Sequence, residues 1–165
     1  MKNRFIPIAI VLISIASVAY ASFASTLTIN GTGTATGNWA VEIISITPTA
    51  QTGATDHVST PSFTSTSATF NVDLAYPGAT SSYQVAIKNN GNITAKLSTI
   101  TDLTSLNAAA PTYITYSVSG VTVNSTLAPG ATATATVTVT WASSASTNPS
   151  GANKSATINF NYIQN

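Results

Sequence analysis

Cysteine is absent from this 165-residue chain, and charged residues make up only 5% of it. Without cysteine no disulfide can support the fold, so stability must come from packing and strand pairing. Beyond the first few residues the chain carries three lysines, at 88, 96 and 154, against four acids, at 42, 56, 73 and 102. This near-neutral balance provides no basic patch for phosphate backbones, so we expect no nucleic-acid partner.

Groups suited to catalysis or metal binding are equally scarce. His57 is the only histidine, and the four acids are spread singly along the chain. Glu42 and Asp73 each lie between apolar neighbours, which predicts outward-facing strand positions rather than a paired acid and base. Asp56 and His57 are adjacent, but two ligands are fewer than a zinc shell requires, so we expect them to be solvated. The sequence therefore predicts no enzyme, no catalytic or cofactor-binding residue and no metal site.

The N-terminus has the pattern of a secretion signal. Two basic residues precede an apolar run over 5–19, and Ala19 and Ala21 occupy the two positions that a signal peptidase inspects. Cleavage would leave Ser22 first, although a second cut after Ala24 stays open. The run is shorter than the roughly 20 residues of a membrane span, so a retained anchor is the weaker alternative. We expect residues 1–21 to be removed and the mature protein to be secreted, with no membrane attachment.

In the rest of the chain, apolar residues recur at every second position, which predicts strands with one buried face. Thr, Val and Ile dominate these stretches and suit a pleated surface. Turn residues such as Pro-Gly and Asn-Gly separate about eight predicted strands: 38–47, 68–76, 82–88, 93–100, 113–119, 120–127, 131–141 and 156–162. The sequence thus predicts an all-β fold, a single Ig-like β-sandwich over residues 37–165.

Several details of this sandwich are also predicted. In 38–47 Trp39, Val41 and Ile43 share one face before the apolar pattern switches to Ile44 and Ile46 on the other face, which indicates a bulge at that point. Trp39 and Trp141 both fall on apolar strand faces and are predicted to lie in the core. Residues 48–61 are expected to form a surface loop, and 101–111 to contain a short helical turn.

The segment 22–36 is a separate feature, because it follows the signal directly and has its own strand pattern. In "STLTINGTGTA" one face carries Leu27, Ile29, Gly31, Gly33 and Ala35, and the other carries Thr and Asn. We name residues 22–36 the donor arm and predict that this apolar face completes the sheet of a neighbouring copy. The alternative is that the strand folds back into its own domain.

The chain resembles the TasA and camelysin family of secreted biofilm-matrix proteins, and within it the archaeal bundling-pilus subunits. The resemblance rests on the signal followed by the Thr-rich strand, on "AYPGATSSYQVAIKNNGNITAKL", on "LAPGATATATVTVTW" and on the closing "ATINFNYIQN". It implies a jelly-roll sandwich that polymerises head to tail by donor-strand exchange and supports biofilm cohesion. Camelysins are also described as proteases, but this chain lacks the His pair of the helical zinc-protease motif.

Four Asn-x-Ser/Thr triplets offer sites for N-glycosylation, at Asn30, Asn92, Asn124 and Asn153. Asn124 is expected on the face opposite Val121 and Val123, so a sugar there would not enter the core. Two other functional classes stay open: a monomeric adhesive or ligand-binding sandwich, and a component of a surface coat. The acceptor groove, lateral bundling and the adhesion target are not specified by the sequence.

Overall fold

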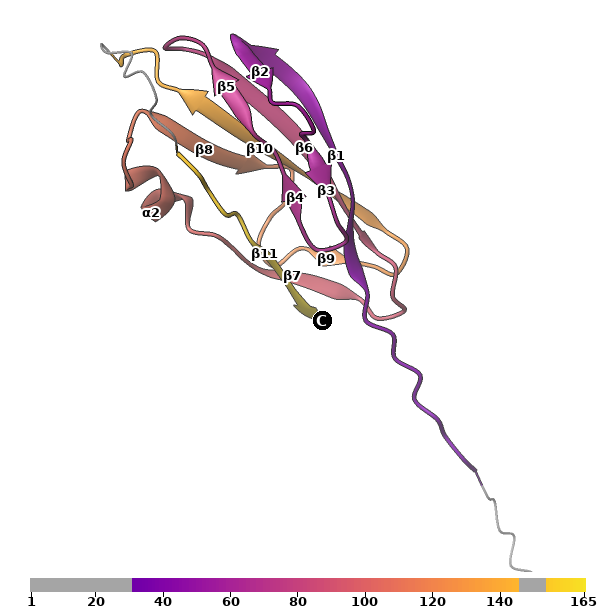
Figure 1. Ribbon diagram of the computed structural model, residues 1–165. Helices are drawn as coiled ribbons and strands as arrows, with labels where there is room; N and C mark the ends of the chain where they lie inside the picture. Colours follow the sequence, from indigo (N-terminus) through magenta and orange to yellow (C-terminus); the bar gives the residue numbers. More distant parts are fainter. Residues whose placement is uncertain (1–30, 146–153) are drawn as a thin grey trace, which may run out of the picture. The chain divides into compact units, whose positions relative to one another are not determined.

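The computed structural model describes residues 31–145 and 154–165 (Figure 1). The chain divides into two compact units, residues 1–35 and 36–165. In the first unit, the described residues 31–35 are exposed and hold no regular secondary structure. All strands of the described part of the chain belong to the second unit.

The second unit is a β-sandwich, which confirms the predicted fold class. Its first layer is an antiparallel four-stranded sheet in the order β1-β6-β10-β8. These strands are β1 (Val41–Thr52), β6 (Thr80–Asn89), β10 (Thr132–Trp141) and β8 (Ile114–Ser119).

The second layer consists of smaller sheets that face the first (Figure 1). One is three-stranded, in the order β11-β7-β9, and the others are the pairs β2-β5 and β3-β4. Their bounds are β2 (Ala54–Asp56), β3 (Ser62–Phe63), β4 (Ala68–Thr69), β5 (Val72–Leu74), β7 (Ala95–Ile100), β9 (Thr126–Leu127) and β11 (Phe160–Gln164).

Strict alternation explains why the central strands form. In β10 the side chains of Ala135, Val137, Val139 and Trp141 are buried, and the threonines between them face outward. β6 has the same alternation and buries Tyr83, Val85 and Ile87. Because successive side chains of a strand point to opposite faces, these runs give the first sheet one apolar face and one hydroxyl-rich face.

The predicted bulge lies where β1 pairs with β6. The register shifts between Ile43 and Ser45, so Ile44 is the extra residue. Ile44 points outward and is exposed, whereas Ile46 is buried opposite Val85. The expectation that Ile44 and Ile46 share the face opposite Ile43 is therefore wrong, because the bulge returns Ile46 to the inner face.

Three other predictions need correction. Trp39 is 42% exposed and precedes β1, so it does not lie in the core, whereas Trp141 does. Of the predicted strand 120–127 only Thr126–Leu127 forms a strand, and Val123 is exposed. Asn124 lies in the preceding connection, with φ of 72°, and its N–H donates to the Leu97 carbonyl. Residues 48–61 are not one loop, because β1 continues to Thr52 and β2 follows.

The predicted helical turn is present as α2 (Leu103–Ala108). The side chain of Asp102 caps its N-terminus by accepting a hydrogen bond from the Thr104 N–H at 2.9 Å. Hydrogen bonds from Ser105 and Thr104 lower the pKa of Asp102. Within residues 31–145 and 154–165, no helix has the length and apolarity to cross a membrane.

Candidate functional site

A groove opens in the second layer of the sandwich, above the buried core residues of the first sheet. Its volume is about 1260 Å³. Its floor is the inner face of the first sheet, including Val85, Ile87, Val137, Val139 and Trp141. One wall is the segment 65–74 with β4 and β5, and the other is the segment 154–162, which leads into β11 (Figure 1). We call these the β4–β5 wall and the C-terminal wall.

Both walls have the pattern of strands that lack a neighbour. Phe70, Val72 and Leu74 on one wall, and Ile158 and Phe160 on the other, point inward but are only partly buried. Among the described residues β5 pairs only with β2, β4 only with β3, and β11 only with β7. Each wall therefore presents an unpaired backbone edge beside a half-open apolar core, which is where a further strand would fit.

The groove is larger than a typical small-molecule site, since such pockets measure roughly 300–1,000 Å³. Every residue from 154 to 162 and from 65 to 74 lines it, so the lining follows the backbone of both walls. An elongated space between two strand edges is shaped for an extended peptide.

The Trp141 indole is the one buried side chain of the described residues that lacks a hydrogen-bond partner at a polar atom, its Nε1. Trp141 is 6% exposed, lines the groove, and lies 5.9 Å from the Tyr113 ring, between centroids. Leaving a buried N–H unpaired costs about 1–3 kcal/mol.

The C-terminal wall is fastened to the first layer by Lys154. Its Nζ lies within hydrogen-bond distance of four backbone carbonyl oxygens, those of Asn107, Ala109, Pro111 and Ile114, at 3.2, 2.8, 3.2 and 2.9 Å, which share its three N–H donors. The Tyr116 hydroxyl in turn donates to the Lys154 carbonyl at 2.6 Å. Desolvation lowers the pKa of Lys154.

The chain segment that follows the donor arm is anchored at one end of the sandwich. The Asn92 side chain accepts from the Asn38 N–H at 2.7 Å and donates to the Thr36 carbonyl at 2.8 Å. The Gly91 N–H donates to the Ala40 carbonyl, and a Cβ at Gly91 would overlap the Asn38 carbonyl oxygen. We call residues 36–40 the arm root.

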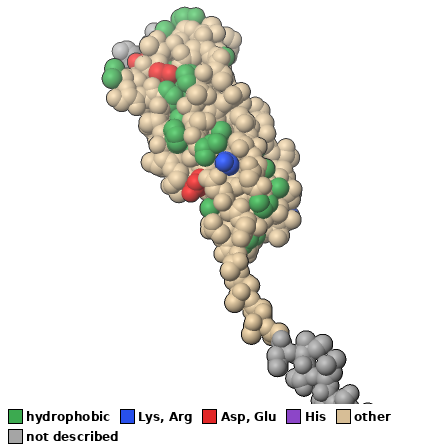
Figure 2. Space-filling view, turned by 90° about the vertical axis from the view of Figure 1, so that its right-hand side faces the viewer, with side chains coloured by type: hydrophobic (Ala, Val, Ile, Leu, Met, Phe, Trp, Pro, Cys, Tyr) green, Lys and Arg blue, Asp and Glu red, His purple; other side chains and the backbone are tan. Residues whose placement is uncertain are grey.

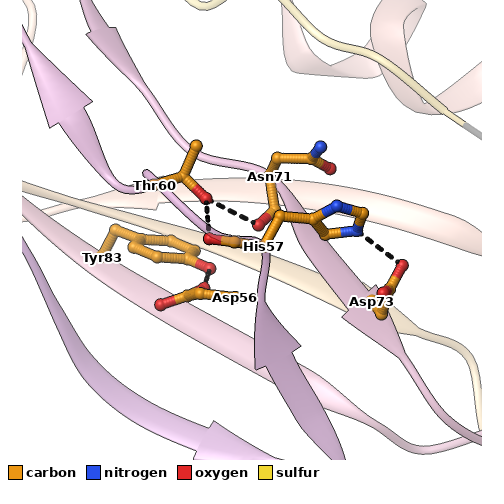
Figure 3. A network of polar contacts seen from close by, with 6 residues as sticks. All are labelled: Asp56, His57, Thr60, Asn71, Asp73 and Tyr83. Atoms are coloured by element: carbon orange, nitrogen blue, oxygen red, sulfur yellow. Dashed lines mark hydrogen bonds and ion pairs between the residues drawn. The ribbon is translucent and has the colours of Figure 1, made fainter.

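Polar side chains near the β4–β5 wall form a network rather than a metal site (Figure 3). His57 Nε2 lies 2.9 Å from Asp73 Oδ1, and both side chains are largely exposed. Asp56 instead accepts a hydrogen bond from the buried Tyr83 hydroxyl. The expectation that Asp56 is simply solvated is therefore wrong, while Asp73 is exposed as predicted. No cluster of three or more metal-ligating side chains occurs among the described residues.

The predicted site residues fall in several places. Ala19, Ala21, Ser22, Leu27, Ile29, Asn30 and Asn153 lie outside the described residues. Gly31, Gly33 and Ala35 are exposed, as are Asn92 and Asn124. The Asn92 carboxamide is engaged by the arm root at both polar atoms, so of these two triplets Asn124 is the better placed to carry a sugar.

Sequence analysis missed the groove and Lys154. The two walls lie far apart in the chain, and the distance between them depends on how the layers stack, which periodicity does not report.

The outer surface carries few charges, and uncharged polar groups with scattered hydrophobic side chains dominate the face in Figure 2.

None of the family models, curated proteins and solved structures compared with the chain matches it. The groove and the pattern of the donor arm therefore carry the functional inference.

Proposed function

We propose that this protein is a structural subunit of an extracellular filament, in which the donor arm of one copy occupies the groove of the next. The observation that carries the proposal is the open groove between two unpaired strand edges in the second layer. The predicted secretion signal supports an extracellular location for the assembly.

The donor arm suits the groove in length and in pattern. The alternating face from Leu27 to Ala35 has as many residues as the C-terminal wall from Lys154 to Tyr162. Its apolar side chains would cover the partly buried inner residues of both walls, and its Thr and Asn side chains would face solvent. Burying a side chain such as Leu27 or Ile29 contributes about 1.5–3 kcal/mol.

Insertion would couple assembly to completion of the fold. A strand in the groove would cover the partly buried inner side chains of the walls and pair both wall edges in a single event, so the bound subunit would gain stability by mass action. Because the arm and the groove are different surfaces, the contact is heterologous. Repeating it without closure gives a fibre. We further propose that such fibres support cohesion of a biofilm matrix or adhesion to a surface.

The test is negative-stain electron microscopy of three mature chains that begin at Ser22. The first is unchanged, the second carries Leu27→Asp and Ile29→Asp on the inward face, and the third carries Thr26→Asp and Thr28→Asp on the outward face. The last two have equal net charge. We expect filaments from the first and third and none from the second, because a carboxylate cannot enter the apolar groove unpaired.

Two results would contradict the proposal. Equal assembly of all three chains would show that the arm's apolar face is not used. Stable monomers from the unchanged chain would instead favour a secreted adhesive module.

A further inference from the structure

We infer that the Asn107 carboxamide closes the outer edge of the first sheet at β8 and thereby confines strand addition to the groove. The inference rests on the proposed function, because it concerns where a subunit accepts the donor arm of another copy. Asn107 is not among the residues that line the groove. It determines specificity by excluding the arm from a competing sheet edge.

β8 is an edge strand of the first sheet. It is the last strand in the order and pairs only with β10 among the described strands. Successive residues of a strand direct their backbone groups to opposite sides within the sheet. In β8 the residues that face outward are Ile114, Tyr116 and Val118, because both backbone groups of Tyr116 bond to Asn107, outside the sheet. A row of unpaired donors and acceptors of this kind is a template for a foreign strand.

The Asn107 side chain occupies this edge as the backbone of a strand would. Its Oδ1 accepts from the Tyr116 N–H at 2.8 Å, and its Nδ2 donates to the Tyr116 carbonyl at 2.9 Å. A carboxamide offers the same kinds of donor and acceptor as a peptide unit, so the two bonds replace those of a partner strand. The next outward residue is engaged as well. The Ile114 N–H donates to the Pro111 carbonyl at 3.3 Å, and the Ile114 carbonyl lies 2.9 Å from Lys154 Nζ.

Helix α2 holds Asn107 in this position beside β8 (Figure 1). Leu103 and Leu106 pack against the core cluster that contains Ile114 and Tyr116. Asn107 follows Leu103 by four residues and therefore lies on the same face of the helix. A helix of six residues is too short to be stable alone, so this packing fixes the carboxamide at the edge.

The opposite edge of the first sheet, β1, is closed by other means. The Ile43 N–H donates to the Ser65 carbonyl at 2.8 Å, and bulges lie next to Ile43 and next to Pro48. Pro48 is opposite Tyr83, which, like Asn89 six residues later, directs its backbone toward β10. Pro48 therefore faces away from β6, where it supplies no N–H to an added strand. Bulges and proline both protect an edge strand from pairing.

The two edges that border the groove lack such a closure. The residues beside them bond toward β2 and β7, so Val72 and Leu74 on one wall, and Ile158 and Phe160 on the other, direct their backbone groups away from these partners. Within residues 31–145 and 154–165, no side chain bonds to the backbone groups of these four residues. The groove is thus the place where the sandwich leaves edges open to a strand.

Hydrogen exchange resolved at single amides tests the inference. The parent is the full mature chain with Leu27→Asp and Ile29→Asp, which is expected not to form filaments. It is compared with the same chain carrying Asn107→Ala or, as the matched control, Thr104→Ala. Thr104 is exposed on the same helix, so the control leaves the contacts with β8 intact. Each chain is measured with and without an excess of the peptide STLTINGTGTA.

In the parent and the control, we expect the peptide to slow exchange at the groove-facing amides of Val72, Leu74, Ile158 and Phe160 by about tenfold or more, and to leave Val118 unchanged. In Asn107→Ala without peptide, the Tyr116 amide should exchange about tenfold faster, because its acceptor is gone. Adding the peptide to this variant should then slow exchange at both outward amides of β8, because the opened edge accepts a second strand.

Protection of Val118 by the peptide in the parent would overturn the inference, because the β8 edge would be open despite Asn107. Unchanged exchange at β8 in Asn107→Ala with peptide would also overturn it, and would leave the filament function standing as long as the groove amides are protected. No protection of the groove amides in any chain would refute the proposed function itself. If Asn107→Ala does not fold, Asn107→Asp takes its place, because a carboxylate keeps the acceptor for the Tyr116 N–H but loses the donor.

Discussion

Tyr83 connects the two layers of the sandwich through its hydroxyl group. The side chain lies on β6, is fully buried, and donates a hydrogen bond to Asp56 of β2 (Figure 3). Its ring stacks on Phe70 of the β4–β5 wall, with centroids 4.4 Å apart. One residue therefore fixes the position of this wall over the first sheet.

This environment makes a prediction for alkaline pH. Burial, together with the Asp56 hydrogen bond, raises the pKa of Tyr83 from 10.0 to about 12. A raised pKa means that the folded state holds the proton more tightly, so the stabilisation is complete below the unfolded pKa and is lost as pH rises through the folded pKa. We expect a loss of about 2–3 kcal/mol from the free energy of unfolding over this window.

Denaturant unfolding across that pH range measures the effect in the unchanged chain and in Tyr83→Phe. Burial also raises the pKa of Tyr116 and Tyr162. Both chains contain these two tyrosines, so both lose the same additional stability at alkaline pH. The difference between the two chains isolates Tyr83, and Tyr76→Phe, at an exposed position, serves as the control. Identical pH profiles for all three chains would contradict the assignment.

Trp141 gives a spectroscopic prediction for the folded subunit. In Trp39→Phe the Trp141 indole is the only one in the chain, so its signals are free of overlap. We expect the ultraviolet resonance Raman band that reports indole N–H hydrogen bonding to lie at the unbonded position, because Nε1 is buried without a partner. A band at the hydrogen-bonded position would contradict this assignment.

The C-terminal wall is an extended segment rather than a paired strand over residues 154–159, so its position depends on a few contacts. Lys154 supplies the main one. We expect Lys154→Met to leave four carbonyl oxygens without this donor, to destabilise the wall by about 1.5–3 kcal/mol and to weaken arm binding.

Hydrogen–deuterium exchange over 154–162 is the measurement, and faster exchange in Lys154→Met is the expected result. Lys88→Met, on β6 of the first sheet, removes the same charge at a position that does not pair with the wall. Equal exchange in the two variants would show that the carbonyl contacts do not hold the segment.

Sequence patterns predicted the elements that carry their own signal. β6 and β10 alternate without interruption, so their inner faces follow from the order of residues. The segment 120–127 also alternates, yet Val123 is exposed, because burial depends on whether another layer covers a residue. The groove could not be predicted for the same reason. It results from two distant segments that do not meet over the first sheet.

Across the whole molecule, scarcity of charge predicts how assembly responds to salt. The donor arm contains no charged side chain, and its target is an apolar floor. Long-range Coulomb attraction therefore contributes little to the rate at which the arm of one copy meets the groove of another. We expect the rate of filament growth to change by less than about threefold between roughly 0.01 M and 1 M sodium chloride, although the Debye length falls from about 30 to 3 Å.

Light scattering during growth at several salt concentrations provides this measurement. A second arm with Thr26→Lys and Thr28→Lys is the matched comparison, because it adds charge on the outward face only. A tenfold or larger dependence on salt for the unchanged chain would indicate that charged surfaces, rather than the groove, control association.

The arm root is bonded to the sandwich directly after β6 ends, and the groove lies between the two walls, so a contact between arm and groove would give any polymer a polarity. One terminus would display a vacant acceptor, and the other an unused arm, so the two tips would differ chemically although every subunit is identical. A short soluble peptide with the sequence of the arm would then block elongation at the acceptor tip and leave the other tip active. Growth, arrest and attachment to other structures could in this way be controlled separately at the two ends of one fibre.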